Sequence, residues 1–378
     1  MPCIAFVPVR QIRTYPRLLR LRHFILKMRQ MAAHNLSMTA VTFPSSWQDR
    51  PWLEQSWRRC LAQGRAPEEA VAFDSVPREA LRRTEEANHD LLKAAQSALQ
   101  KLGAAIASTR YFAILTDSQG VVIHTGGDID ASDVRASSIT RVGVNLSEHS
   151  IGTSAIGLAL HEQQPVWLHR TEHFFNATSV YSCAGAPLFS PKGQCIGMLD
   201  LTGIDAKERP ELMHLVAHAA SGIENTMVHN LPYALMVRVN WPGISLGEAS
   251  DGLLALDTDG HVLGFNPVAK KMLNAHLSTH ANDLFATPFE HFFDAARISK
   301  PCIDVPLWSG LRVNAAPLLP RQQPPSIAMT EQLPLKEVTS QLIKQAIQGT
   351  RGNVAEAARQ LGISRATLYR KLAPTSQL

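Results

Sequence analysis

The sequence predicts an α+β multidomain chain, with two α/β sensor-like units followed by an all-α C-terminal module. Short apolar segments separated by turn signals, such as residues 117–120 and 190–193, are typical of antiparallel strands joined by hairpins. Apolar residues that recur every three to four positions predict helices at both ends of this strand-rich region. From residue 336 onward the pattern is helical, so the chain is expected to end in a helical module.

The first unit, residues 47–230, begins with two helical patterns. The shorter covers 52–60, and a longer apolar period covers 78–108. Strands are expected at 111–116 and 121–124, a helix at 151–161, a strand at 165–169, and a strand pair at 180–188 and 194–201. A helix over 212–228 closes the unit.

A smaller second unit is predicted over residues 245–318. Residues 251–260 are typical of a strand and turn, and residues 261–265 of the returning strand. Asn266 is placed to cap the helix that follows. Residues 311–317 are expected to form the closing strand, and the proline-rich stretch 319–335 a stiff linker.

The C-terminal module, residues 336–378, has the pattern of two helices joined by a tight turn. Asn353 can cap the first helix, Gly362 ends it, and Ser364 caps the second. Because Leu368 and Leu372 lie at i and i+4 on the buried side, the other face presents basic and hydroxyl groups that suit the DNA major groove. The candidate base-reading residues are Arg365, Thr367, Tyr369 and Arg370. Phosphate contacts are expected from Asn353, Arg359 and Lys371.

This pattern, Ala-Ala-x-x-Leu-Gly-Ile-Ser-x-x-Thr-Leu-Tyr from residue 357, resembles the Fis-type helix-turn-helix of bacterial enhancer-binding regulators. The resemblance implies a homodimer paired through residues 336–348, and therefore a palindromic operator in double-stranded DNA. An ordinary amphipathic hairpin with a solvated basic face is the alternative. Charge favours DNA, because residues 336–378 hold seven Lys/Arg against two acids whereas residues 41–335 sum to −7.

The first unit carries a second resemblance. The segments 115–120, 147–157 (Ser-Glu-His-Ser-Ile-Gly-Thr-Ser-Ala-Ile-Gly), 172–174 and 183–187 are similar to the GAF domain of AcoR-like acetoin catabolism regulators. GAF domains bind small molecules between the sheet and its covering loops, so the resemblance implies an effector site. The residues that it implies are Glu148, Thr153, Ser154, Glu172, His173 and Cys183. Ser154 stands where relatives usually carry Asn, and Leu146 or Ser147 where they tend to carry Trp.

Each of these polar residues also has a structural interpretation. Thr153 and Ser154 are placed to cap the helix that follows them. Glu172 and His173 can form a hydrogen-bonded pair, and Cys183 can be a small core residue. A further hypothesis has Cys183 facing Cys195 across neighbouring strands, which would permit redox sensing.

The same family implies that the second unit is PAS-like, with a packing or dimerisation role. In AcoR-like regulators an AAA+ ATPase lies between this unit and the helix-turn-helix. The present sequence has no G-x-x-x-x-G-K-[ST] motif and no Gly-Ala-Phe-Thr-Gly-Ala loop, and only the linker occupies that position. ATP-driven activation of sigma-54 polymerase is therefore not expected.

Composition argues against several other classes. Five cysteines without a C-x-x-C pair argue against a disulfide framework and a zinc site, and no apolar stretch approaches the length of a membrane span. No cofactor, metal site or catalytic group is predicted, and a cytoplasmic location is expected. Residues 1–46, with seven Lys/Arg and no acid in the first forty, are interpreted as an extension from an upstream start. A transit peptide, a nucleic-acid arm and an amphipathic surface helix are the alternatives.

These observations predict a ligand-responsive, sequence-specific transcription regulator that acts by operator occupancy. Its expected partners are double-stranded DNA, a small-molecule effector and a second copy of the chain, with RNA polymerase as a further candidate. Two other classes stay open, namely a GAF-type thiol enzyme or redox sensor, and a nucleoid-associated architectural protein whose DNA binding is insensitive to sequence.

Overall fold

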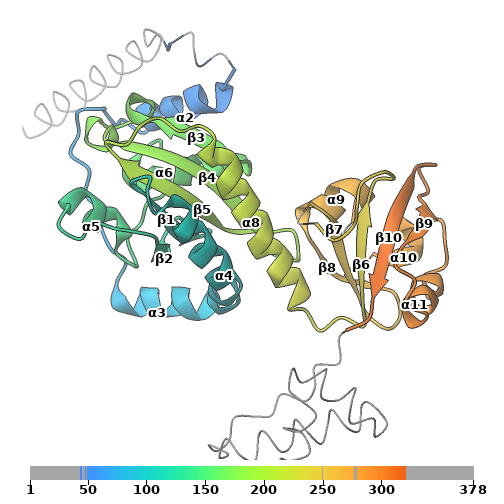
Figure 1. Cartoon of the computed structure of the whole chain (residues 1–378). Coiled ribbons are helices and arrows are strands. Elements are labelled where there is room, and N and C mark those ends of the chain that lie inside the picture. Colours follow the sequence, from blue (N-terminus) through green and yellow to red (C-terminus); the bar gives the residue numbers. More distant parts are fainter. Residues whose placement is uncertain (1–42, 45–46, 48, 249, 276–278, 321–378) are drawn as a thin grey trace, which may run out of the picture. The chain divides into compact units, whose positions relative to one another are not determined.

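A computed structural model describes residues 43–320 of the chain, except 45, 46, 48, 249 and 276–278 (Figure 1). Within these ranges the chain forms two five-stranded sheets, and all the strand pairs that build them are antiparallel. None of the helices in this part of the chain combines the length and the hydropathy that a membrane span requires. The C-terminal module and all but the first two residues of the predicted linker lie outside the described residues, as does nearly all of the N-terminal extension.

The first sheet has the strand order β2–β1–β5–β4–β3. Its strands are β1 (Tyr111–Asp117), β2 (Val122–Gly126), β3 (Val166–His169), β4 (Tyr181–Phe189) and β5 (Cys195–Ile204). The central strand β5 pairs with β1 through Tyr111↔Gly203 and with β4 through Cys183↔Thr202. The strands predicted from the short apolar segments and their turn signals are therefore confirmed, with ends shifted by a few residues.

Successive side chains of each strand point to opposite faces of the first sheet. Tyr111, Ala113 and Leu115 pack on one face with α4 (His89–Ile106) and α8 (Leu212–His229). Phe112 and Ile114 belong to a separate core on the other face, which we call the effector face. Helices α5 (Val134–Thr140), α6 (Glu148–Ile151) and α7 (Ala155–Glu162) contribute to the core on the effector face. Figure 1 shows α5 and α6 on this unit. Two short helices, η2 (Arg170–Glu172) and η3 (Asn176–Thr178), follow β3 along the chain.

The long helix predicted over 78–108 is instead two helices, α3 (Arg78–Ala87) and α4. They separate at Asn88, where ψ is 13° and the side-chain amide donates a hydrogen bond to the carbonyl of Thr84 at 2.8 Å. That side-chain bond competes with helix continuation. α3 buries none of its residues, whereas α4 buries six, so only α4 contributes to the core beneath the sheet.

The helix predicted over 151–161 corresponds to α7, which begins four residues later at Ala155, and the short helix α6 precedes it. Gly152 lies between them with φ +69°, and a Cβ atom at this position would come within 2.8 Å of the Phe175 ring. Only glycine combines this backbone conformation with so close an approach. The break lets residues 152–154 leave the helical path and reach the cavity described below.

The second sheet has the order β8–β7–β6–β10–β9. Its elements are β6 (Leu235–Asn240), β7 (Gly252–Leu256), β8 (Val262–Phe265), α9 (Pro267–Leu273), α10 (Ala281–Leu284), α11 (Glu290–Arg297), β9 (Ile303–Pro306) and β10 (Arg312–Leu318). Asn266 caps α9 as predicted, since its side-chain oxygen accepts a hydrogen bond from the amide of Ala269 at 2.8 Å. β6 precedes the predicted boundary at residue 245, and the sequence analysis did not predict α10, α11 or β9.

Candidate functional site

A small cavity lies on the effector face, between the first sheet and the helices that cover it. Its volume is about 30 Å³. Because roughly 10–15 Å³ holds one water molecule, this space suits a ligand of a few non-hydrogen atoms. Every residue that lines it is buried except Phe73, which is half-buried. The other apolar lining residues are Ile114, Ile139, Leu146, Ile151, Ala155 and Ile156.

Three of the six predicted effector residues line this cavity, namely Ser154, His173 and Cys183. The other three, Glu148, Thr153 and Glu172, bond instead to α2 (Pro51–Ala62) or to the residue before it. The polar lining also includes three side chains that the sequence analysis did not single out, Thr178, Tyr181 and Thr202. Thr202 was detectable in principle, because it is a polar residue in an apolar central strand.

His173 lines this cavity and carries an unpaired acceptor. Its Nδ1 lies 3.0 Å from the carbonyl oxygen of Arg170, and because a carbonyl only accepts, Nδ1 carries the proton. Burial lowers the pKa of His173 to about 4, so the ring is neutral near pH 7. Nε2 is therefore an acceptor, and within the described part of the chain it has no hydrogen-bond partner.

Ser154 and Thr153 differ in role although they are adjacent. The Ser154 hydroxyl oxygen accepts the amide of Gly157 at 3.1 Å, so it caps α7 as predicted. Its side chain also lines the cavity. The Thr153 hydroxyl points the other way and lies 2.8 Å from the hydroxyl of Ser56 in α2. The chain at this position thus connects the cavity to α2.

A buried polar group adjoins the cavity in the middle of the sheet. Cys183 and Thr202 are partners across β4 and β5, with Sγ and Oγ1 3.4 Å apart, and Thr202 donates a hydrogen bond to Asp200. Burial raises the pKa of Asp200 to about 7, and one of its carboxyl oxygens has no partner among the described residues. Burial and the nearby Asp200 also raise the pKa of the Cys183 thiol well above its ordinary value, so the thiol stays protonated.

The hypothesis that Cys183 faces Cys195 is wrong. The register pairs Cys183 with Thr202 and Cys195 with Phe189, at opposite ends of the β4–β5 pair. Residues 190–193 form a short hairpin turn, and this turn fixes the register. All four cysteines in the described ranges are free.

Glu148 fastens α6 to α2. Its carboxylate accepts hydrogen bonds from Arg59 at 2.7 and 2.8 Å and from the hydroxyl of Ser56 at 2.7 Å. Burial alone would raise the pKa of Glu148, but these hydrogen bonds and the guanidinium charge outweigh it and lower the pKa. The hydrogen bond to Glu148 likewise raises the pKa of Arg59.

Glu172 links the η2 loop to α2 and to Arg50, the residue before it, in the same way. Its carboxylate accepts two hydrogen bonds from Arg50, one of them at 3.1 Å, and its backbone carbonyl accepts the indole N–H of Trp57 at 2.8 Å. Glu172 does not pair with His173, because each bonds elsewhere. We call this set of contacts the α2 clasp, and define it as Arg50, Ser56 and Arg59 with Glu148 and Glu172.

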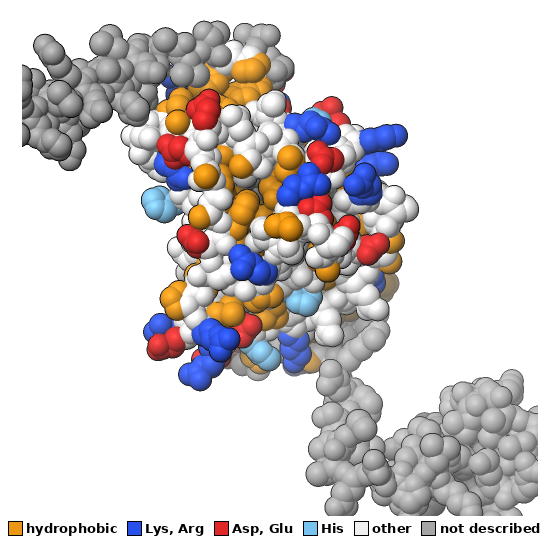
Figure 2. Space-filling view, turned by 90° about the vertical axis from the view of Figure 1, so that its left-hand side faces the viewer, with side chains coloured by type: hydrophobic (Ala, Val, Ile, Leu, Met, Phe, Trp, Pro, Cys, Tyr) orange, Lys and Arg blue, Asp and Glu red, His pale blue; other side chains and the backbone are white. Residues whose placement is uncertain are grey.

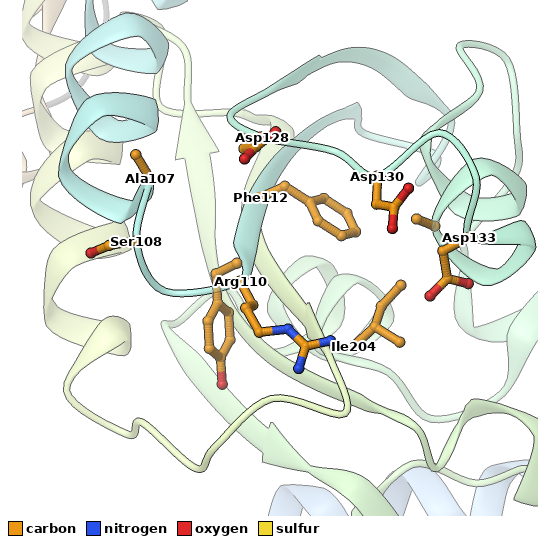
Figure 3. Close-up of a pocket in the computed structure, with 10 residues that line it drawn as sticks. Ala107, Ser108, Arg110, Phe112, Asp128, Asp130, Asp133 and Ile204 are labelled. Carbon is orange, nitrogen blue, oxygen red and sulfur yellow. The ribbon is translucent and has the colours of Figure 1, made fainter.

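A larger and more open cleft of about 260 Å³ lies at the start of β1 (Figure 3). Arg110 and the loop acids Asp128, Asp130 and Asp133 line it. Asp133 caps α5, and Asp130 accepts hydrogen bonds from within its own loop. In the described ranges no three His, Cys, Asp or Glu side chains are grouped as a metal site would need. The carboxylates of Asp130 and Asp133 therefore bond within their own loop and helix.

The predicted DNA-contacting residues lie outside the described residues. They are Asn353, Arg359, Ser364, Arg365, Thr367, Tyr369, Arg370 and Lys371. On the face shown in Figure 2, Lys and Arg side chains lie among Asp and Glu side chains. That face offers no concentrated positive charge to phosphates, whereas the sequence concentrates such charge in residues 336–378.

Two segments of the chain match protein families. Residues 334–373 match "Bacterial regulatory protein, Fis family", and residues 55–225 match "MimR, N-terminal domain". The first match covers the predicted helix-turn-helix and confirms it. The second covers the first sheet and the residues that line its cavity.

Two of the curated relatives that the chain matches are transcription regulators of acetoin metabolism. The acetoin catabolism regulatory protein of Cupriavidus necator is 31% identical over 64% of this chain, and the acetoin dehydrogenase operon activator AcoR of Bacillus subtilis is 28% identical over 47%. The aligned parts are 37% and 29% of those proteins' lengths. Among solved structures, the Escherichia coli DhaR(N)–DhaL complex aligns with 71% of this chain and 99% of that one, at 16% identity and a TM-score of 0.45.

Proposed function

Because the chain carries a Fis-family DNA-binding helix-turn-helix and is homologous to AcoR-type acetoin regulators, we propose that it is a ligand-responsive, sequence-specific transcription regulator. A small molecule in the effector-face cavity changes how tightly a dimer of the chain binds a palindromic operator. The observation that carries this proposal is a cavity with one unpaired acceptor, His173 Nε2, in a chain that also has a DNA-binding module.

The α2 clasp supplies a route from the cavity to the rest of the chain. Ser154 and His173 line the cavity, and each follows directly after a residue that is bonded to α2 or its flank. A ligand that displaces either cavity segment therefore changes the geometry of α2. The ligand can shift α2 between its ligand-free and ligand-bound geometries only by the difference between its affinities for them.

Regulation in this proposal comes from operator occupancy alone. The sequence lacks the phosphate-binding motif of an ATPase, and residues 319–335 are too few to hold a nucleotide-binding domain. A bound dimer represses by blocking the promoter, or activates by contacting RNA polymerase at an adjacent site.

The cavity environment does not favour the thiol-enzyme alternative. A thiol nucleophile or redox sensor needs a lowered pKa and access to solvent. Cys183 is buried beside Thr202 and Asp200, and its pKa is raised. Its surroundings are those of a small core residue.

A footprint of the full chain on the DNA upstream of its own gene tests the proposal. The control is the double variant Arg365→Ala/Arg370→Ala, which removes two base-reading candidates and leaves the residues around the cavity unchanged. We expect a protected palindrome that the double variant loses, with affinity at least about tenfold lower, since each bidentate base contact contributes about 1–3 kcal/mol.

Two results would contradict the proposal. Protection that spreads evenly along any DNA and disappears steeply with added salt would indicate an architectural protein instead. Equal protection by the double variant would show that the predicted recognition helix does not read the bases.

A further inference from the structure

We propose that a pocket between the β4–β5 hairpin and α9 binds a small organic carboxylate with an apolar body. We call this space the junction pocket, because residues of the first unit and of the second unit both line it. It is separate from the effector-face cavity, and no residue lines both spaces. The inference therefore goes beyond the proposed function and does not depend on DNA binding.

Two hydrogen bonds join the two sides of the junction pocket. The amide of Phe265, at the end of β8, donates to the carbonyl of Pro191 in the hairpin at 3.0 Å. The side-chain amide of Asn266 donates to the side-chain oxygen of Asn225 on α8 at 2.8 Å. Both sides also belong to one compact part of the chain, residues 1–320. The walls of the pocket are therefore bonded to each other.

The size and the walls of the junction pocket indicate a ligand with an apolar body. Its volume is about 400 Å³, within the range of about 300–1,000 Å³ that is typical of small-molecule sites. Phe189, Phe265 and Pro267 form an apolar wall. Phe265 is 3% exposed and Phe189 is half-buried, so the fold holds both rings in place. A ligand ring or short hydrocarbon chain can cover this wall.

The charge of the junction pocket is positive. Its lining includes Lys270 and Lys271 of α9 and no Asp or Glu. Among the described residues, neither ammonium group forms a hydrogen bond or an ion pair. A Cβ atom at Gly193 would lie 3.3 Å from Nζ of Lys270, so this ammonium group lies against the hairpin turn. Two unpaired cations beside an apolar wall favour a carboxylate over a neutral or cationic ligand.

Glu224 does not neutralise this charge near pH 7. Its side chain is 5% exposed and accepts a hydrogen bond from the amide of Phe189 at 2.9 Å. Burial raises the pKa of Glu224 to about 8, although the charge of Lys271 acts in the opposite direction. The carboxyl group is therefore mostly protonated near pH 7, and the lysines remain available to an anion.

Three probes separate the charge of the ligand from its apolar body, namely phenylacetate, phenylacetamide and acetate. Phenylacetamide has the shape of phenylacetate without its charge, and acetate has the charge without the ring. Each probe is titrated to about 20 mM into the full chain at pH 7 without DNA, because ligands this small bind in about the millimolar range. Binding is measured from the line widths of the proton resonances of the probe.

Double variants of the lysines make the test specific. Lys270→Met/Lys271→Met removes both charges and keeps apolar side chains, whereas Lys270→Arg/Lys271→Arg keeps both charges. The matched control is Lys192→Met/Lys300→Met, which removes two charges from exposed lysines that do not line the pocket. His173→Asn is the control for the effector-face cavity, whose volume of about 30 Å³ is too small for phenylacetate.

We expect saturable binding of phenylacetate that is about fivefold tighter than that of phenylacetamide, since two partly exposed ion pairs together contribute about this factor. Acetate should bind at least about tenfold more weakly than phenylacetate, because it leaves the apolar wall uncovered. The methionine double variant loses the preference for phenylacetate over phenylacetamide, the arginine double variant keeps it, and both controls leave it unchanged.

Three results would overturn the inference. They are equal binding of phenylacetamide and phenylacetate, an equal loss of affinity in Lys192→Met/Lys300→Met, and no saturable binding of phenylacetate by the folded chain. Because binding is measured without DNA and outside the effector-face cavity, its failure is distinguishable from a failure of the proposed function.

Discussion

The α2 clasp predicts a measurable coupling between residues far apart in the sequence. Arg59→Ala, Glu148→Ala and the double variant form a thermodynamic cycle across one ion pair that joins α2 to α6. The two residues are 89 positions apart and are linked by hydrogen bonds of 2.7 and 2.8 Å. The coupling energy from this cycle shows whether the contact stabilises the first unit or is an incidental surface ion pair.

The size of the effect follows from burial. The Arg59 and Glu148 side chains are 27% and 15% exposed, so the pair lies between a surface ion pair and a buried one. Loss of one partner costs about 0–1 kcal/mol at the surface and about 3–5 kcal/mol in the interior. We expect about 2 kcal/mol for either single variant and a coupling energy of about 1–2 kcal/mol.

The assay is denaturant unfolding of the full chain, followed by tryptophan fluorescence, because Trp57 lies on α2. A matched control is the Arg58–Glu54 pair on the same helix, whose side chains are 49% and 36% exposed. Its coupling energy should stay below about 0.5 kcal/mol. Equal coupling in the two cycles would refute the reasoning.

The pH dependence of the same cycle is a second check on the clasp. Glu148 has a lowered pKa in the folded chain, so its contribution is complete above its ordinary value of 4.5. The contribution is lost as the pH falls through the lower folded value. The Arg59–Glu148 coupling should thus persist at pH 6 and vanish in acid.

Three other changes have defined outcomes. Burial raises the pKa of Asp200 from 3.8 to about 7 in the folded chain. The stabilising contribution of Asp200 is therefore complete below pH 3.8 and is lost as the pH rises toward 7. Relative to Asp200→Asn, the wild type should lose up to about 4 kcal/mol of unfolding free energy between pH 4 and pH 8. Gly152→Ala should lower the free energy of unfolding by about 3 kcal/mol in the same denaturant assay, because φ is +69° and the added Cβ would meet the Phe175 ring. An unchanged denaturation midpoint would argue against the strained turn. Cys183→Ser should leave the DNA footprint unchanged with and without a mild oxidant, and an oxidant response that this variant removes would revive the redox hypothesis.

The strands were predictable because their signals are local. The short apolar segments on either side of the turn at 190–193 identify β4 and β5 without knowledge of any distant contact. The break at Asn88 was not predictable in this way, since the apolar period runs through that position. The cap at Ser154 was predicted, but the turn at Gly152 was not. At Asn88 a side-chain bond ends the helix, and at Gly152 a ring from another segment requires the turn.

The cavity on the effector face shows the same limit. The resemblance named two segments that reach this cavity, but it did not distinguish Thr153 from Ser154 or Glu172 from His173. Which neighbour faces the cavity depends on α2, whose bonds to these segments span between 89 and 122 residues. The spacing of residues within the segment 147–157 or 172–174 does not reveal that α2 bonds to it. The apolar cavity wall was likewise indistinguishable from ordinary core.

The proposed function requires that occupancy of the effector-face cavity and operator binding are linked. The most direct measurement is the operator dissociation constant with and without a small molecule that saturates this cavity, paired with the affinity of that molecule with and without operator. We predict that both affinities change by the same factor, about fivefold or more, and that His173→Asn removes the change while keeping the palindromic footprint. Operator affinity that stays constant while the cavity is saturated would contradict it.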